Sequence, residues 1–131
     1  MLIIKGLMLI GSESVGRSVL FTEDKFILKL TGALSLFALK REVKIPYKAI
    51  KNAFADYFKA PFWMLKMPGT AIAPLNIYEG TFRYKNEWYF LSYEHKVPLV
   101  NLELDGTQKY QYVIFEIQNP HDIIQELRKR L

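Results

Sequence analysis

The two histidines, His95 and His121, are the residues best suited to acid–base or metal chemistry near neutral pH. Neither has a nucleophile or a second metal ligand at a standard spacing, and the chain contains no H-E-x-x-H, G-x-S-x-G or phosphate-loop motif. The chain also lacks cysteine, which excludes thiolate catalysis, disulfides and cysteine-ligated metals. We therefore predict no catalytic residue, no cofactor and no metal ligand, and we expect a protein that is not an enzyme. A site assembled from distant residues stays open.

A cluster of basic residues is the next candidate for chemistry. Its members are Lys40, Arg41, Lys44, Lys48 and Lys51, with only Glu42 among them. The net charge of the chain is +5, and the positive excess lies before Lys66. Such a cluster can dock on anionic lipid, where each basic side chain near the surface contributes about 1 kcal/mol. The alternation of these charges with apolar neighbours also fits the solvated outer face of a strand, so both interpretations are open.

The segment Phe58–Pro68 is strongly apolar for a region that the prolines mark as a loop. Its large apolar residues are Phe62, Trp63, Met64, Leu65 and Met67. Three interpretations compete. The segment can fold back over the core, form an interface with a partner or a second copy, or dip into a membrane with Lys59 and Lys66 at headgroup level. We predict an interaction surface here.

Nucleic-acid binding is not predicted. The aromatic residues Trp88, Tyr89 and Phe90 lie on one expected strand, but they alternate between its faces and are flanked by Glu87 and Glu94. A stacking platform needs exposed aromatic side chains on one face beside basic residues.

The elements that must position these residues are mostly strands. Period-two alternation and turn residues bound each of them. The expected strands are Arg17–Thr22, Lys25–Leu30, Leu36–Ile45, Leu75–Tyr84, Glu87–Tyr93, Val97–Leu104 and Tyr110–Ile117. Leu7–Ile10 is a candidate for a further short strand, and Lys51–Phe58 has an extended pattern. Tyr47–Ile50 is expected to form one helical turn, and 59–74 is expected to be irregular because its prolines disfavour both a helix and a central strand. Gly80 suggests a bulge.

A helix from Asn119 to Leu131 is expected to end the chain. Asn119 can cap the helix, and Pro120 suits its first position. Apolar residues recur three and four positions apart, at Ile123, Ile124, Leu127 and Leu131, and form one stripe. Because an isolated helix of this length is marginal in water, it is expected to dock on the strands.

Together these elements predict a mainly β fold, α+β by count. We expect a single domain over 1–131: a bent antiparallel β-barrel of seven or eight strands capped by the C-terminal amphipathic helix. The predicted core is Val19, Phe21, Phe26, Leu28, Val43, Ile45, Trp88, Phe90, Val113, Phe115, Ile124 and Leu127.

The order of elements resembles a bacterial pleckstrin-homology-like domain, close to GRAM domains. The resemblance rests on the hairpin Ser18–Leu28 (SVLFTEDKFIL), the segment Val43–Ile50 (VKIPYKAI) and the closing helix. It implies a bent barrel with the helix plugging one end. The hairpin turn is Glu23-Asp24 rather than basic, and the helix lacks the tryptophan usual in that family. No phosphoinositide site is therefore expected.

The leading expectation for function is a non-enzymatic interaction module that contacts a protein partner or forms a homo-oligomer. The alternative is a peripheral domain that binds anionic lipid through Lys44, Lys48 and Lys51 and the Phe62–Leu65 wedge. A barrel that holds a small apolar ligand inside is a third class that stays open, although the many large aromatic side chains would fill a small barrel. The N-terminal apolar run is too short to span a bilayer, which needs about 20 residues. The expected location is cytoplasmic, at the membrane surface in the alternative.

Overall fold

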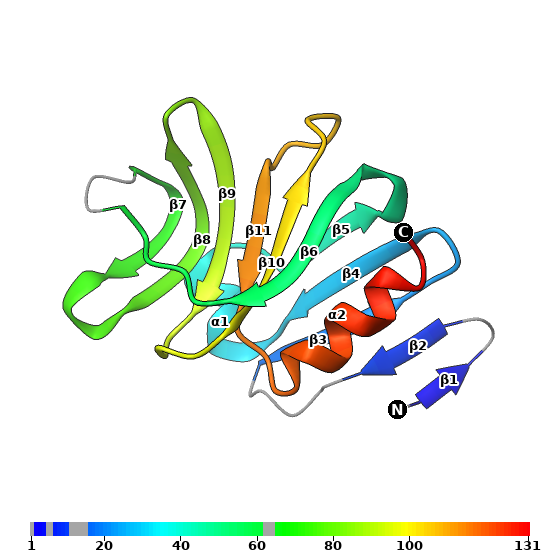
Figure 1. Cartoon of the computed structure of the whole chain (residues 1–131). Coiled ribbons are helices and arrows are strands. Elements are labelled where there is room, and N and C mark those ends of the chain that lie inside the picture. Colours follow the sequence, from blue (N-terminus) through cyan, green and yellow to red (C-terminus); the bar gives the residue numbers. More distant parts are fainter. Residues whose placement is uncertain (1, 5–6, 11–15, 62–64) are drawn as a thin grey trace.

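The computed structural model describes residues 2–4, 7–10, 16–61 and 65–131, which form two β-sheets and a C-terminal helix (Figure 1). The strands of the first sheet follow the chain in the order β1-β2-β3-β4-β5, and those of the second have the order β6-β10-β11-β9-β8-β7. The strands are β1 (Leu2–Ile4), β2 (Leu7–Ile10), β3 (Arg17–Phe21), β4 (Lys25–Leu30), β5 (Glu42–Pro46), β6 (Ile50–Asp56), β7 (Leu65–Ile72), β8 (Ile77–Tyr84), β9 (Glu87–Tyr93), β10 (Leu99–Leu104) and β11 (Tyr112–Phe115). The helices are α1 (Gly32–Ala38) and α2 (Pro120–Arg128), with short 3-10 turns at Tyr47–Ala49 and Ala73–Leu75.

The first sheet is built around the predicted β3–β4 hairpin. Phe21 pairs with Phe26 across the turn, and the Thr22 side chain accepts the backbone N–H of Lys25 at 3.0 Å. Alternate residues of β3 are buried, so one face of the hairpin is apolar. The 3-10 turn Tyr47–Ala49, also predicted, then leads the chain from β5 into the second sheet.

The second sheet has one parallel pair, between β9 and β11, and its other pairs are antiparallel. The two-residue turn Lys85–Asn86 joins β8 to β9 with φ of 50° and 63°, the left-handed values that suit this tight hairpin. Gly80 pairs with Gly69 beside the register shift between β7 and β8. A Cβ at Gly69 would lie 2.6 Å from the Glu79 carbonyl oxygen, so this close approach requires glycine.

The core lies between the two sheets, and α2 completes it (Figure 1). Ile123, Ile124 and Leu127 of the predicted stripe are buried, and Arg128 donates a hydrogen bond to the Ala53 carbonyl oxygen of β6 at 2.9 Å. Asn119 occupies the capping position in a left-handed conformation and makes no side-chain cap, so its backbone carbonyl rather than its side chain accepts the first helical N–H groups. The predicted core residues are all buried except Trp88, which is partly buried against the core.

Several expectations were wrong. No pairing among the described strands joins the two sheets, so they do not close into a barrel. The described residues form eleven strands rather than seven or eight, and β11 is parallel to β9. The expected strand Leu36–Ile45 divides into the end of α1, a turn and β5. The region expected to be irregular contains β7, an edge strand of the second sheet, where Pro68 is tolerated because an edge has unpaired positions.

No helix within the described residues is long and apolar enough to cross a membrane.

Candidate functional site

The short helix α1 presents a group of exposed apolar side chains. Leu36 is 69% exposed, Phe37 is 50% exposed and Leu39, which ends the helix, is 63% exposed, whereas Ala38 is buried. The helix packs against the second sheet, where the Thr70 hydroxyl of β7 donates to the Phe37 carbonyl oxygen at 3.1 Å. Single exposed apolar residues are common, but three large ones within four positions form a local patch.

Leu39 adopts a backbone conformation that leucine usually avoids. Its φ is 54° and its ψ is 38°, in the left-handed region where a helix commonly ends in glycine or asparagine. Leucine pays roughly 1–2 kcal/mol for this conformation because its Cβ approaches the backbone. The site therefore combines a strained backbone with an exposed apolar side chain, two costs at one position that a glycine would avoid. Backbone strain at an exposed apolar residue supports the hypothesis that this residue has a function.

Basic residues follow the apolar group directly. Lys40 and Arg41 succeed Leu39, and no acidic residue lies between Gly32 and Arg41. The Lys40 ammonium lies 6.0 Å from the centre of the Tyr110 ring, and this cation–π contact holds the Lys40 side chain beside Tyr110. Beyond them, Lys44 forms an exposed ion pair with Glu42 at 3.3 Å. We call Leu36, Phe37, Leu39, Lys40 and Arg41 the α1 surface.

The structure divides the predicted basic cluster. Lys40 and Lys44 line one shallow groove beside Tyr110, whereas Lys48 lines another with Arg130 and Leu131 of the C-terminus. Lys40 precedes β5, and Lys48 and Lys51 follow it, so the length of this strand separates them. Lys51 lies near enough to Asp105 to contribute to the lowered pKa of that carboxyl, which the side-chain and backbone hydrogen bonds from Thr107 mainly cause. The five residues are therefore not one patch.

The predicted apolar surface is only partly within the described residues. Phe62, Trp63 and Met64 lie outside them, and Leu65 and Met67 belong to β7, although their side chains are not among those described. Lys40 and Arg41 of the α1 surface belong to the predicted basic cluster, but the apolar members were not predicted as a surface, because the sequence pattern predicts a strand over Leu36–Ile45. Gly32 and the run of helix-compatible residues after it were the available signal, and nothing in the sequence indicated that Leu39 would take a left-handed conformation.

A buried polar network joins the two sheets. The Arg17 side chain of β3 donates to Ser92 Oγ at 2.8 Å and to Glu79 Oε2 at 3.0 Å, and it also pairs with Glu94. Ser92 donates in turn to Glu79 Oε1 at 2.6 Å. Arg17, Glu79 and Ser92 are almost fully buried. Their polar groups therefore satisfy one another in the interior rather than facing solvent.

The single guanidinium of Arg17 cannot neutralise the carboxylates of both Glu79 and Glu94. One of these two carboxyl groups is therefore expected to keep its proton. Burial raises the pKa of Glu79 to about 9, with a hydrogen bond to Glu94 adding to the effect and with Arg17 and Ser92 opposing it. The Glu79 side chain is fully buried, whereas the Glu94 side chain is 25% exposed. Glu79 is therefore a neutral hydrogen-bonding acid at pH 7, and Glu94 supplies the partner of Arg17.

Replacing Glu79 with glutamine is expected to flatten the pH dependence of stability. The folded chain keeps a proton that the unfolded chain releases above about pH 4.3. The stability due to Glu79 is therefore complete below that pH and is lost as the pH rises towards about 9. The slope for one proton is at most about 1.4 kcal/mol per pH unit. Urea unfolding of Glu79→Gln between these pH values should show a shallower decline in the free energy of unfolding with rising pH than the wild type.

Glu23→Gln in the exposed hairpin turn is the matched control. Equal slopes for Glu79→Gln and the wild type would contradict the protonated state of Glu79.

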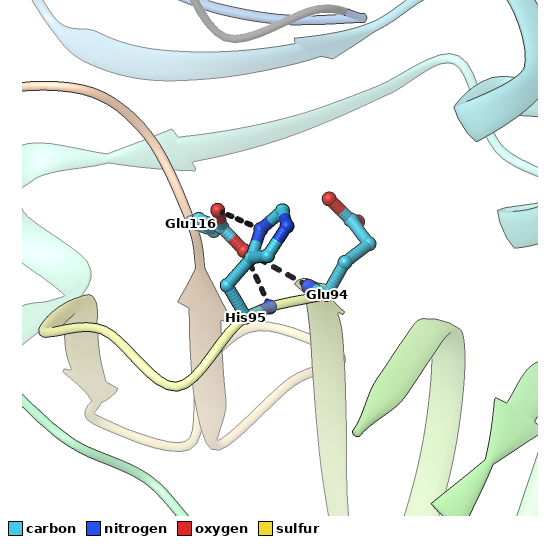
Figure 2. Close-up of side chains that lie close together, drawn as sticks. All are labelled: Glu94, His95 and Glu116. Atoms are coloured by element: carbon cyan, nitrogen blue, oxygen red, sulfur yellow. Dashed lines mark hydrogen bonds and ion pairs between the residues drawn. The ribbon is translucent and has the colours of Figure 1, made fainter. Parts of the chain in front are cut away.

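The turn after β9 brings Glu94, His95 and Glu116 together (Figure 2). Glu116 Oε1 accepts the backbone N–H groups of Glu94 and His95, each at 2.9 Å, and Glu116 Oε2 lies 2.7 Å from His95 Nδ1. Burial raises the pKa of Glu116, but these hydrogen bonds and the His95 charge outweigh it, so the pKa is lowered overall. The contacts fasten the turn to the end of β11.

Among the residues that the structure describes, Glu94, His95 and Glu116 form the group whose ligand atoms could hold a metal ion, since these atoms lie within 4.8 Å of one another. A cation would have to compete with Arg17 for Glu94 and with two backbone N–H groups and the imidazole for Glu116. The arrangement is that of a closed hydrogen-bond network, so we assign it a structural role.

Comparisons of the chain with protein-family models, curated proteins and solved structures find no match.

Proposed function

We propose that this chain is a non-enzymatic module that docks peripherally on anionic membranes through the α1 surface. The observation that supports the proposal is that Leu36, Phe37 and Leu39, at the end of α1, are followed directly by Lys40 and Arg41 in the turn before β5. Apolar side chains can enter the boundary between headgroups and acyl chains while adjacent cations contact anionic headgroups. The left-handed Leu39 fits this function because it exposes a leucine where glycine would relieve the backbone.

The energy available from this surface suits reversible docking. Burying one large apolar side chain contributes about 1.5–3 kcal/mol when it starts fully exposed, and these three start between half and two-thirds exposed. Lys40 and Arg41 add about 1 kcal/mol each near an anionic surface. These contributions oppose the loss of translational and rotational freedom on binding.

Electrostatics favour lipid over a second copy as the occupant of this surface. A symmetric contact between two α1 surfaces would bring Lys40 and Arg41 of each copy towards those of the other. Like charges in an interface are repulsive, and lysine is depleted from interface cores. Anionic headgroups provide complementary charge without that repulsion.

We also propose that the chain has a pleckstrin-homology-like architecture in which the described strands form two open sheets instead of closing into a barrel. The resemblance of Ser18–Leu28 and Val43–Ile50 to that family supports it, together with the order of a first sheet, a second sheet and a closing helix. The proposal concerns architecture alone, because a fold does not determine a function.

Co-sedimentation with vesicles tests the membrane proposal. We expect binding to phosphatidylcholine vesicles that contain phosphatidylglycerol, weaker binding to phosphatidylcholine alone, and a decline with salt because charges at the surface are screened. Combining Leu39→Asn with Phe37→Ser should lower the vesicle affinity about tenfold or more, which corresponds to losing at least 1.4 kcal/mol of contact. Leu39→Asn should not destabilise the fold, since asparagine tolerates the left-handed conformation better than leucine does.

Leu131→Asn is the matched control, because Leu131 is also an exposed leucine, at 52%, but lies at the end of the chain away from α1. It should bind vesicles as the wild type does. Equal binding to neutral and anionic vesicles, or wild-type affinity in the α1 double variant, would contradict the proposal.

Contact with a protein partner or a second copy is the second candidate, and the position of β7 favours it. This strand is at the edge of the second sheet and includes Leu65 and Met67 of the predicted interaction surface. An edge strand has unpaired backbone groups that can pair with another chain. Self-association would appear in sedimentation velocity as a mass that rises with concentration. A single monomer boundary at all concentrations would contradict self-association.

A further inference from the structure

A groove of about 640 Å³ lies on the face of the second sheet that points away from the core between the sheets. Three separate segments meet around it: the residues that follow β6, the start of β8 and the turn between β9 and β10. Binding sites for small molecules typically have volumes of roughly 300–1,000 Å³. The groove is therefore large enough for a small organic ligand.

The floor of the groove is apolar and held in place from below. Phe58, Tyr78 and Val97 line it. The buried Tyr93 ring lies under two of these residues, with its centre 5.3 Å from that of Tyr78 and 6.3 Å from that of Phe58. Phe58 also packs on Tyr89 at 6.2 Å. The aromatic floor is thus part of a packed cluster, which favours a preformed surface over one that must be ordered on binding.

The groove is lined by basic residues and by no described acidic residue. These basic residues are Lys59, His95 and Lys96. Neither lysine makes an ion pair with a carboxylate among the described residues. Glu116 engages His95 through Nδ1, and Nε2 of the neutral ring is then an acceptor, so the two lysines are the donors for an anionic group. Positive and hydrogen-bonding groups above an apolar floor complement a ligand that has one anionic end.

We propose that this groove binds a small amphipathic carboxylate, with its apolar body on Phe58, Tyr78 and Val97 and its carboxylate near Lys59 and Lys96. Aromatic and aliphatic side chains provide the contact area, and the two lysines provide charge-assisted hydrogen bonds to the anionic group. This site is distinct from the α1 surface, and its residues are not used in the proposed membrane docking.

Titration of the isotope-labelled full chain with decanoate, followed by amide NMR shifts, tests the proposal. We expect saturable shifts at 57–60 and 95–97, and binding of decan-1-ol about tenfold weaker because the alcohol lacks the charge. Lys59→Glu combined with Lys96→Glu should lower decanoate affinity about tenfold or more. The matched charge change, Lys48→Glu with Lys51→Glu, should leave that affinity unchanged, and so should Leu39→Asn.

Val97→Asp provides a second variant, since it places a negative charge on an exposed turn at the groove and should also weaken decanoate binding. The proposal would be overturned by equal affinity for decanoate and decan-1-ol, by wild-type affinity in the Lys59/Lys96 variant, by shifts confined to other regions, or by no saturable shift at millimolar decanoate. Vesicle binding by the α1 surface is measured separately, so failure of either proposal is recognised independently of the other.

Discussion

Replacing Arg17 with methionine is expected to lower the free energy of unfolding by about 3–5 kcal/mol, the cost of leaving a buried charge network without its partner. Arg17 contacts Ser92, Glu79 and Glu94 from the opposite sheet, and it is 3% exposed. Methionine fills similar space but cannot donate hydrogen bonds. Glu94 would then lose its cationic partner, and the buried Glu79 acid and Ser92 would lose a hydrogen-bond donor that water could not replace. Urea unfolding at pH 7 measures the loss.

Two further variants make the Arg17 measurement specific. Lys29→Met removes a cation from an exposed position on the neighbouring strand β4 and should change stability by no more than about 0.5 kcal/mol. Adding Glu79→Leu to Arg17→Met should recover part of the loss, because it removes the most deeply buried carboxyl group. A loss below about 1 kcal/mol for Arg17→Met would show that the network does not stabilise the two-sheet core.

Replacing Leu127 with alanine is expected to cost about 2–5 kcal/mol, the range for removing a large aliphatic side chain from a core. Leu127 is fully buried on α2, in the same apolar cluster as Phe26 and Phe115 of the two sheets. The loss combines the transfer of the side chain from the core with the cavity that remains. Urea unfolding at constant pH measures it.

Leu131→Ala is the control for Leu127→Ala. Both residues belong to the predicted apolar stripe, but Leu131 is 52% exposed and follows the end of α2. Its substitution should change stability by no more than about 0.5 kcal/mol. If Leu127→Ala also changed stability that little, α2 would not be an integral part of the core.

The sequence predicts best those elements in which period and burial agree. Val19 and Phe21 on β3 are buried as their alternation predicts, and Ile124 and Leu127 face the core from α2 as their spacing predicts. The β7 strand was missed because Pro68 within it, and Pro61 and Pro74 on either side, argue against a central strand, whereas the structure places β7 at an edge. The α1 helix was missed because its residues fit both a helix and a strand. The contacts with β7 and β8 that accompany the helix come from distant parts of the chain, so a local pattern does not reveal them.

The site residues were less predictable than the fold, for a physical reason. Arg17 meets Glu79 and Ser92 across 62 and 75 positions of sequence, so no local pattern predicts the network. The basic cluster was visible in the sequence, but the course of β5 separates Lys40 from Lys48. The exposure of Leu36 and Leu39 depends on how α1 packs against the second sheet, which a one-dimensional pattern does not specify.

The most direct test of membrane docking is an environment-sensitive label at Leu39. The chain has no cysteine, so Leu39→Cys provides a single site for a nitrobenzoxadiazole label, and Lys48→Cys provides the matched site at the other end of β5. Anionic vesicles should shift the emission of the label at Leu39 to shorter wavelength and leave the label at Lys48 unchanged, because only the α1 surface enters the lipid boundary. An unchanged spectrum at Leu39 while the protein co-sediments with vesicles, or an equal shift at both positions, would contradict docking through α1.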